Sequence, residues 1–96
     1  MKHAFVVTYD ISDSARWRQV FRLMKGYGEW IQLSVFMCEL TGVQLVELRS
    51  RLSAEIHHDL DQVLFIDIGP ADGRAVNAVQ GIGRKYALEP PGPVIV

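Results

Sequence analysis

The chain begins with a block of apolar and β-branched residues and then changes its hydrophobic period. Residues 3–9 are rich in β-branched and aromatic types, which predicts a strand, and the polar residues 10–14 predict a loop with several possible helix N-caps. From Ala15 onward, large apolar residues recur at helical spacing, at Trp17, Val20, Phe21, Met24 and Tyr27. This stripe predicts an amphipathic helix that ends at Gly26 and Gly28.

A long extended run follows, and a second helix comes after it. Residues 29–39 form either one continuous strand or two strands bent near residues 32–34 into a tight hairpin, and the sequence leaves both alternatives open. Thr41 and Gln44 match a capping box, with Thr41 as the N-cap. Apolar residues then line one face of a predicted helix over residues 42–57, namely Leu45, Leu48, Leu52 and Ile56.

The last third of the chain predicts one further strand and a small extension. Residues 62–68 are apolar and strand-like, and residues 69–73 have the composition of a turn. Residues 74–80 are weakly helical, and residues 81–88 suit a short irregular strand. A proline-rich segment then leaves an apolar tail at residues 94–96, which can add to a sheet edge in its own protomer or in a partner.

The order of these elements predicts an α+β, ferredoxin-like βαββαβ fold with a short C-terminal strand. We expect one domain over residues 1–96, with a core at 1–69 and an extension at 70–96 that packs on a dimer partner. Two helices cover one face of such a sheet and leave the other without a helix. The uncovered face favours a homodimer.

Composition and charge narrow the class of protein. The 96 residues are 49% hydrophobic and 22% charged, which excludes a disordered chain. Ten Lys and Arg against eleven Asp and Glu exclude a strongly basic nucleic-acid arm, yet residues 13–27 carry four basic residues and one acid. A single cysteine, no apolar run near the ~20 residues of a membrane span, and no signal-peptide layout lead us to expect a cytoplasmic protein without membrane contact.

Asp10 is the first candidate for chemistry. It ends the first strand, next to the start of the basic helix, where a carboxylate can hold a divalent metal. One carboxylate is too little for a site by itself, but Mg²⁺ takes one or two carboxylates together with waters and phosphates, and a twofold dimer supplies a second Asp10. The alternative is that Asp10 only caps the loop before the helix.

Basic and aromatic side chains form a second set of candidates. The predicted first helix carries Arg16, Arg18, Arg22 and Lys25, which can follow the phosphates of a nucleic acid or form a solvated helix face. Tyr9 and Phe36 can stack on bases, or they belong to the core.

Three segments together resemble a known family. The first strand ends in Tyr9-Asp10-Ile11-Ser12-Asp13, the extended run contains Gln32-Leu33-Ser34-Val35-Phe36, and Asp61 precedes the strand-like residues 63–68. This combination is similar to the CRISPR-associated protein two family, the small subunit of the spacer-acquisition machinery. The resemblance covers residues 3–69 and extends more loosely to the apolar tail.

The resemblance implies a function as well as a fold. It implies a homodimer whose C-terminal strand packs on the other protomer, with Mg²⁺ or another divalent metal held between the two Asp10 residues. It further implies a metal-dependent endonuclease that acts on single-stranded RNA or double-stranded DNA, and a larger CRISPR-associated integrase as partner. Tyr9, Asp10, Phe36 and an arginine of the first helix, Arg16 or Arg18, correspond to positions that the family uses.

Two other functions remain open at this point. The dimer can act as a non-catalytic bridge that binds DNA for the partner integrase, with Arg18 and Arg22 as its contacts. A weaker alternative is a toxin that cleaves mRNA.

Overall fold

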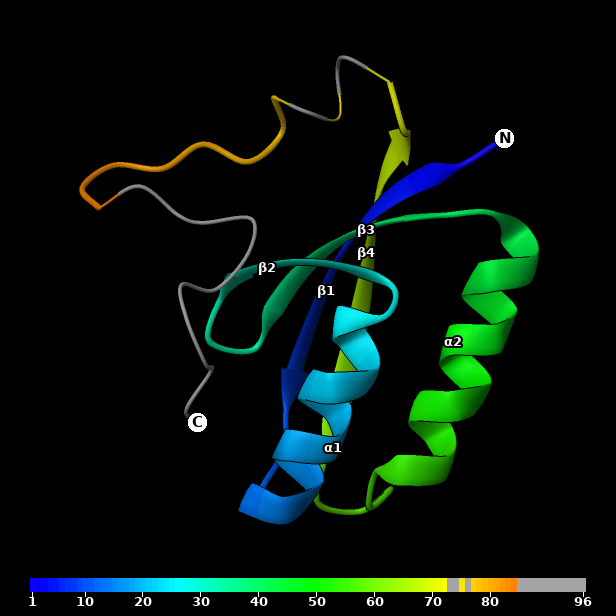
Figure 1. The fold of residues 1–96 in the computed structure, drawn as a ribbon, viewed down its shortest axis with the longest axis vertical. Coiled ribbons are helices and arrows are strands. Elements are labelled where there is room, and N and C mark those ends of the chain that lie inside the picture. Colours follow the sequence, from blue (N-terminus) through cyan, green and yellow to red (C-terminus); the bar gives the residue numbers. More distant parts are fainter. Residues whose placement is uncertain (73–74, 76, 85–96) are drawn as a thin grey trace.

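The structure is a computed structural model in which residues 1–72, 75 and 77–84 are described. Its elements follow one another as β1 (His3–Asp10), α1 (Ser14–Lys25), β2 (Gly28–Gln32), β3 (Val35–Leu40), α2 (Gly42–Glu55) and β4 (Gln62–Pro70). The strands pair antiparallel in the order β2-β3-β1-β4, and both helices lie on one face of the sheet (Figure 1). The predicted α+β fold with a βαββαβ order is confirmed.

The core lies between the sheet and the two helices. Side chains alternate along β1, so Phe5, Val7 and Tyr9 face the helices and are buried. They pack against β3 and the inner sides of both helices, where the buried residues include Val20, Phe21, Met24, Phe36, Cys38, Leu40, Leu48 and Leu52.

The opposite face of the sheet, called the open face below, is apolar and has no described helix over it. Val6 and Thr8 of β1 pair with Ile66 and Leu64 of β4 on this face. Leu64 and Ile66 keep 48% and 47% of their surface exposed. Asp10 ends the β1 row on the same face, opposite Gln62.

Both helices begin at the caps that their sequences provide. Asp13 is the N-cap of α1, and its carboxylate accepts a hydrogen bond from the Arg16 backbone N–H at 2.9 Å. Thr41 and Gln44 form the predicted capping box of α2, in which each side chain accepts a hydrogen bond from the other residue's backbone N–H. The α1 helix ends at Lys25, with Gly26 as its C-cap.

The extended run is a hairpin, which settles the alternative that the sequence left open. The strands β2 and β3 are joined by Leu33 and Ser34, and Leu33 has a φ of 34°, in the left-handed region that favours glycine. In β2, Gly28 lies so close to β3 that a Cβ on it would meet the Cys38 Sγ at 2.4 Å. Only glycine fits at this position without a shift of the neighbouring strand.

The last third of the chain differs in part from the prediction. Strand β4 continues through Gly69 to Pro70, so the turn begins two residues later than expected, because residues 3 and 70 still pair across a bulge. Within the described residues 81–84 there is no strand. Residues 85–96, with the predicted apolar tail, lie outside the described residues. Among the described helices, none has the length and hydropathy needed to cross a bilayer.

Candidate active site and nucleic-acid interface

Asp10 is exposed at the end of β1, as the alternation of the strand predicted. Within the described part of the chain, no hydrogen bond or ion pair engages its carboxylate, and no three His, Cys, Asp or Glu side chains gather into a metal-binding group. Mg²⁺ needs only one or two protein carboxylates when waters and phosphates complete its shell. A free carboxylate on the open face therefore fits one half of a site shared by two chains, and does not form a site alone.

The buried carboxylate of Asp61 connects the loop after Asp10, the start of α1 and the end of α2. Asp61, in the loop between α2 and β4, accepts hydrogen bonds from the Ser12 backbone N–H at 3.0 Å and from the Ser12 hydroxyl at 3.1 Å. It also accepts from the His57 N–H at 2.8 Å. The Arg16 guanidinium donates to it through Nε at 2.8 Å and Nη2 at 3.2 Å. The Asp61 side chain is fully buried by these contacts, and that of Arg16 is 28% exposed.

These contacts make the stability of the fold depend on pH. The Arg16 guanidinium, helped by the N–H groups of His57 and Ser12, holds the pKa of Asp61 well below its ordinary value of 3.8. A carboxylate with a depressed folded-state pKa contributes stability above its unfolded-state pKa, and this contribution is lost as the pH falls toward the folded-state pKa. The pKa of Asp67 is also depressed, by the Gly69 N–H and then by His3, so it acts in the same direction.

We therefore expect the thermal unfolding midpoint to fall as the pH is lowered from about 5 to 3. In Asp61→Asn the fall is expected to be shallower, because position 61 no longer titrates. Circular dichroism melts across this pH range measure how the unfolding midpoint of wild type and of Asp61→Asn changes with pH. Asp67→Asn is melted in parallel for comparison. Parallel curves for wild type and Asp61→Asn contradict this assignment.

The basic residues of α1 divide into two groups. Arg16 is held by Asp61, whereas Arg18, Arg22 and Lys25 are exposed. The Lys25 ammonium lies 5.9 Å from the centre of the Phe21 ring, so its stem covers part of the core while its charge stays in water. The exposed group lies on the helix layer, and Asp10 lies on the open face. The structure thus joins Arg16, through Asp61 and Ser12, to the loop that follows Asp10. The other three basic residues lie on a separate surface.

Tyr9 and Phe36 lie together in the core and not with Asp10. Phe36 is completely buried, Tyr9 is 6% exposed, and their ring centres are 6.3 Å apart. Trp17 and Phe21 extend this aromatic cluster. Both predicted stacking residues face the helices, so neither ring is open to a nucleotide in this conformation. Their catalytic role stays a prediction, which this geometry does not favour.

The Tyr9 hydroxyl allows a direct test of that role. It is buried and, among the described residues, has no hydrogen-bond partner, and burial raises its pKa well above the ordinary value of 10.0. Removing an unpaired buried hydroxyl removes a desolvation cost, so Tyr9→Phe is expected to raise the free energy of unfolding by up to ~1 kcal/mol with activity unchanged. Urea unfolding and an activity assay on the same preparation check this. Lost activity at full stability restores the catalytic prediction.

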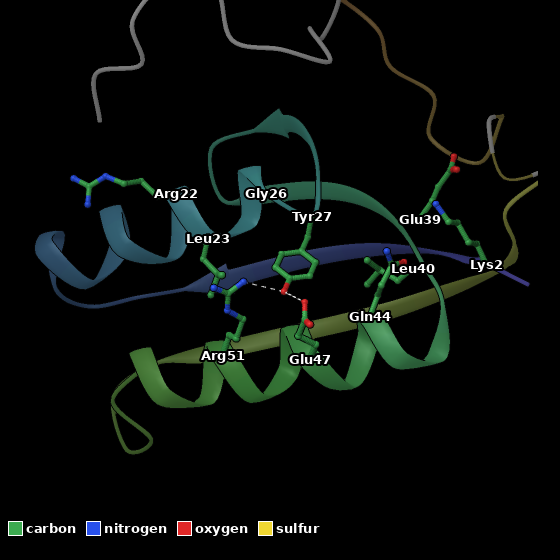
Figure 2. A pocket seen from close by; sticks show the side chains of 10 residues that line it. All are labelled: Lys2, Arg22, Leu23, Gly26, Tyr27, Glu39, Leu40, Gln44, Glu47 and Arg51. Atoms are coloured by element: carbon green, nitrogen blue, oxygen red, sulfur yellow. Dashed lines mark hydrogen bonds between the residues drawn. The ribbon is translucent and has the colours of Figure 1, made fainter.

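A second polar cluster, which the sequence reasoning missed, lies between α2 and the turn that follows α1. The Tyr27 hydroxyl donates to a Glu47 carboxylate oxygen and accepts a hydrogen bond from Arg51 Nη1 at 3.0 Å (Figure 2). These three side chains line part of an open hollow of about 590 Å³ between α1 and α2. Neither Asp10 nor Arg16 lines this hollow, and basic and acidic side chains both do. These hydrogen bonds join α2 to Tyr27, in the turn between α1 and β2.

Cys38 has none of the properties of a nucleophile. It lies in β3 opposite Gly28 of β2 and is completely buried in the core, and burial raises the pKa of its thiol to about 12. The thiolate is therefore not populated near neutral pH.

The chain is similar to proteins of one family over most of its length. The sequence model described as CRISPR associated protein Cas2 matches residues 3–76. A CRISPR-associated endoribonuclease Cas2 of Rhodospirillum rubrum is 48% identical over 88% of this chain and 82% of its own. One of Geobacter sulfurreducens is 37% identical over 90% of each chain. The crystal structure of Streptococcus pyogenes Cas2 has a TM-score of 0.72 at 28% identity, and covers 83% of this chain and 99% of its own.

Proposed function

Because this chain belongs to the CRISPR associated protein Cas2 family, we propose that it is a metal-dependent endonuclease of the CRISPR spacer-acquisition machinery. Its proposed substrate is single-stranded RNA or double-stranded DNA, since relatives are named endoribonucleases and exposed arginines suit either backbone. The observation that carries the proposal is that the Asp10 carboxylate is exposed and bonded to no described residue. The loop that follows it is connected to Arg16 through Asp61.

We place the active form in a homodimer that joins two open faces. Leu64 and Ile66 are half-exposed there, and burying such side chains is worth roughly 25 cal/mol per Å² of apolar surface. Asp10 stands on this same face, at the end of the row formed by Val6 and Thr8. A second copy that docks by a twofold axis on this face brings its own Asp10 to it, which supplies the second carboxylate.

Asp10 and Arg16 have distinct roles in the proposed cleavage. Magnesium, the proposed metal, would supply charge neutralisation at the scissile phosphate and a water of lowered pKa. The two Asp10 carboxylates would hold that ion and would orient the attacking water. Arg16 binds a flanking phosphate through the part of its guanidinium that Asp61 leaves unoccupied.

The proposal is tested with purified protein and labelled single-stranded RNA and duplex DNA. Both substrates are incubated with Mg²⁺ or with EDTA, and Asp10→Asn, purified in parallel, controls for contaminating nucleases. We expect cleavage that requires both Mg²⁺ and Asp10. Equal cleavage by wild type and Asp10→Asn contradicts the proposal.

A second function is favoured by the exposed basic residues of α1. Arg18, Arg22 and Lys25 lie on the helix layer, away from the open face, so they can bind DNA without taking part in cleavage. In this function the dimer is a bridge that carries DNA for a partner integrase. Replacing Arg18 and Arg22 by Ala should then weaken duplex DNA binding and reduce its salt dependence, while Asp10→Asn leaves both unchanged.

A further inference from the structure

The geometry points to a role for Asp61 that goes beyond stabilising the fold. We propose that Asp61 is a positioning residue for nucleic-acid binding, which fixes the Arg16 guanidinium and the loop after Asp10 in one arrangement so that Arg16 presents its remaining nitrogen to a phosphate. The inference rests on the proposed function, because the phosphate is that of the polynucleotide.

The hydrogen bonds of Arg16 leave one of its nitrogens unoccupied. Nε and Nη2 both donate to Asp61, and Nη2 also donates to the Ser12 hydroxyl at 3.1 Å. Among the described residues, nothing accepts a hydrogen bond from Nη1. A guanidinium is rigid and planar, so fixing two of its nitrogens also fixes the direction of the third. The Arg16 side chain keeps 28% of its surface exposed, so the guanidinium is not closed off from a ligand as a whole.

Asp61 fixes the backbone beside Asp10 by the same set of contacts. Ser12, two residues after Asp10, gives both its N–H and its hydroxyl to the carboxylate, and His57 holds that carboxylate from the α2 side. The five hydrogen bonds use both oxygens of Asp61. An asparagine has one accepting oxygen where aspartate has two, so its NH2 group, itself a donor, must face at least two of these donors.

The sign of the effect on affinity separates positioning from bulk electrostatics. Asp61 carries a negative charge next to a proposed phosphate contact, so electrostatics alone predict that its neutralisation tightens RNA binding. Positioning predicts weaker binding, because Arg16 then loses its fixed direction. Asp67→Asn is the matched control, since it removes the same charge from another hydrogen-bonded aspartate, which contacts His3 at the far end of β1 and β4.

The experiment measures affinity for a labelled single-stranded RNA by fluorescence anisotropy in EDTA, which removes cleavage and metal from the readout. Asp61→Asn is expected to bind about fivefold to tenfold more weakly than wild type, and Asp67→Asn within about twofold of it. Circular dichroism confirms that each variant is folded at the assay temperature. Arg16→Lys, which keeps the charge but loses the planar fork, is expected to weaken binding as much as Asp61→Asn, and it carries the test if Asp61→Asn does not fold.

Each outcome decides the inference. If Asp61→Asn, or Arg16→Lys in its place, binds as tightly as wild type or more tightly, the positioning role is overturned, and cleavage by wild type leaves the proposed function intact. If the variants weaken binding as expected and wild type does not cut RNA or DNA, the cleavage proposal fails and the positioning role stands. If wild type binds neither RNA nor DNA, both are overturned.

Discussion

Replacing Asp10 by Asn is expected to lower Mg²⁺-dependent cleavage by at least ~100-fold and to leave the thermal unfolding midpoint unchanged. A metal ion contributes several kcal/mol of charge stabilisation in a phosphoryl transition state, and each 1.36 kcal/mol is tenfold in rate. An asparagine keeps the shape of the side chain but loses the charge that holds the ion. Because Asp10 is exposed and no described residue bonds its carboxylate, we expect the free energy of unfolding to change by less than about 0.5 kcal/mol.

The control for this substitution is Asp59→Asn. Asp59 is another exposed aspartate, in the loop between α2 and β4, so the change in net charge is the same. We expect Asp59→Asn to cleave as wild type does. Loss of cleavage in both variants would assign the effect to overall charge, and retained cleavage in Asp10→Asn would remove the metal site from the mechanism.

Replacing Phe36 by Ala is expected to destabilise the fold by about 3–5 kcal/mol, the largest loss that we predict for any single side chain. Phe36 is completely buried in the centre of the sheet. Its ring centre lies 5.5 Å from that of Phe21, in an edge-on arrangement, and 6.3 Å from that of Tyr9. Small domains are stable by about 5–15 kcal/mol, so this loss removes much of the total. Urea unfolding followed by tryptophan fluorescence measures it, since Trp17 and Trp30 pack against the core.

Phe36→Leu separates the core role from the predicted stacking on a nucleotide. Leucine keeps most of the apolar volume and no ring, so the fold is expected to survive with a much smaller loss than in Phe36→Ala. If Phe36 acts only by packing, the cleavage rate of folded Phe36→Leu equals that of wild type. A stable Phe36→Leu that no longer cleaves would mean that the ring leaves the core to meet the substrate.

The helices were predictable because their signals are local. The Thr41 and Gln44 capping box and the leucines after it lie within one helix, and each residue's role follows from its spacing. The hairpin was not decided, because its turn at Leu33 and Ser34 has none of the Asn-Gly or Gly-containing pairs that mark such turns. In the structure, β3 pairs with β1 along its whole length, from Val35 to Leu40, and no local signal in the sequence reveals this pairing.

The candidate site was predictable only where it depends on one strand. Alternation along β1 placed Asp10 on the face opposite Tyr9, and the structure confirms this. The contacts of Asp61 join it to residues 49 and 45 positions away, and no spacing rule connects positions so far apart. The same limit applies to Arg16, whose charge suggested a phosphate contact but whose spacing could not reveal an ion pair.

The burial of Cys38 makes the chain suitable for site-specific chemical labelling. The sequence contains one cysteine, and it is completely buried in the core. Native protein should therefore resist maleimide reagents, and Ile66→Cys would carry the one reactive sulfur. A bifunctional crosslinker that joins two such chains would then report directly how near their open faces lie to each other in solution.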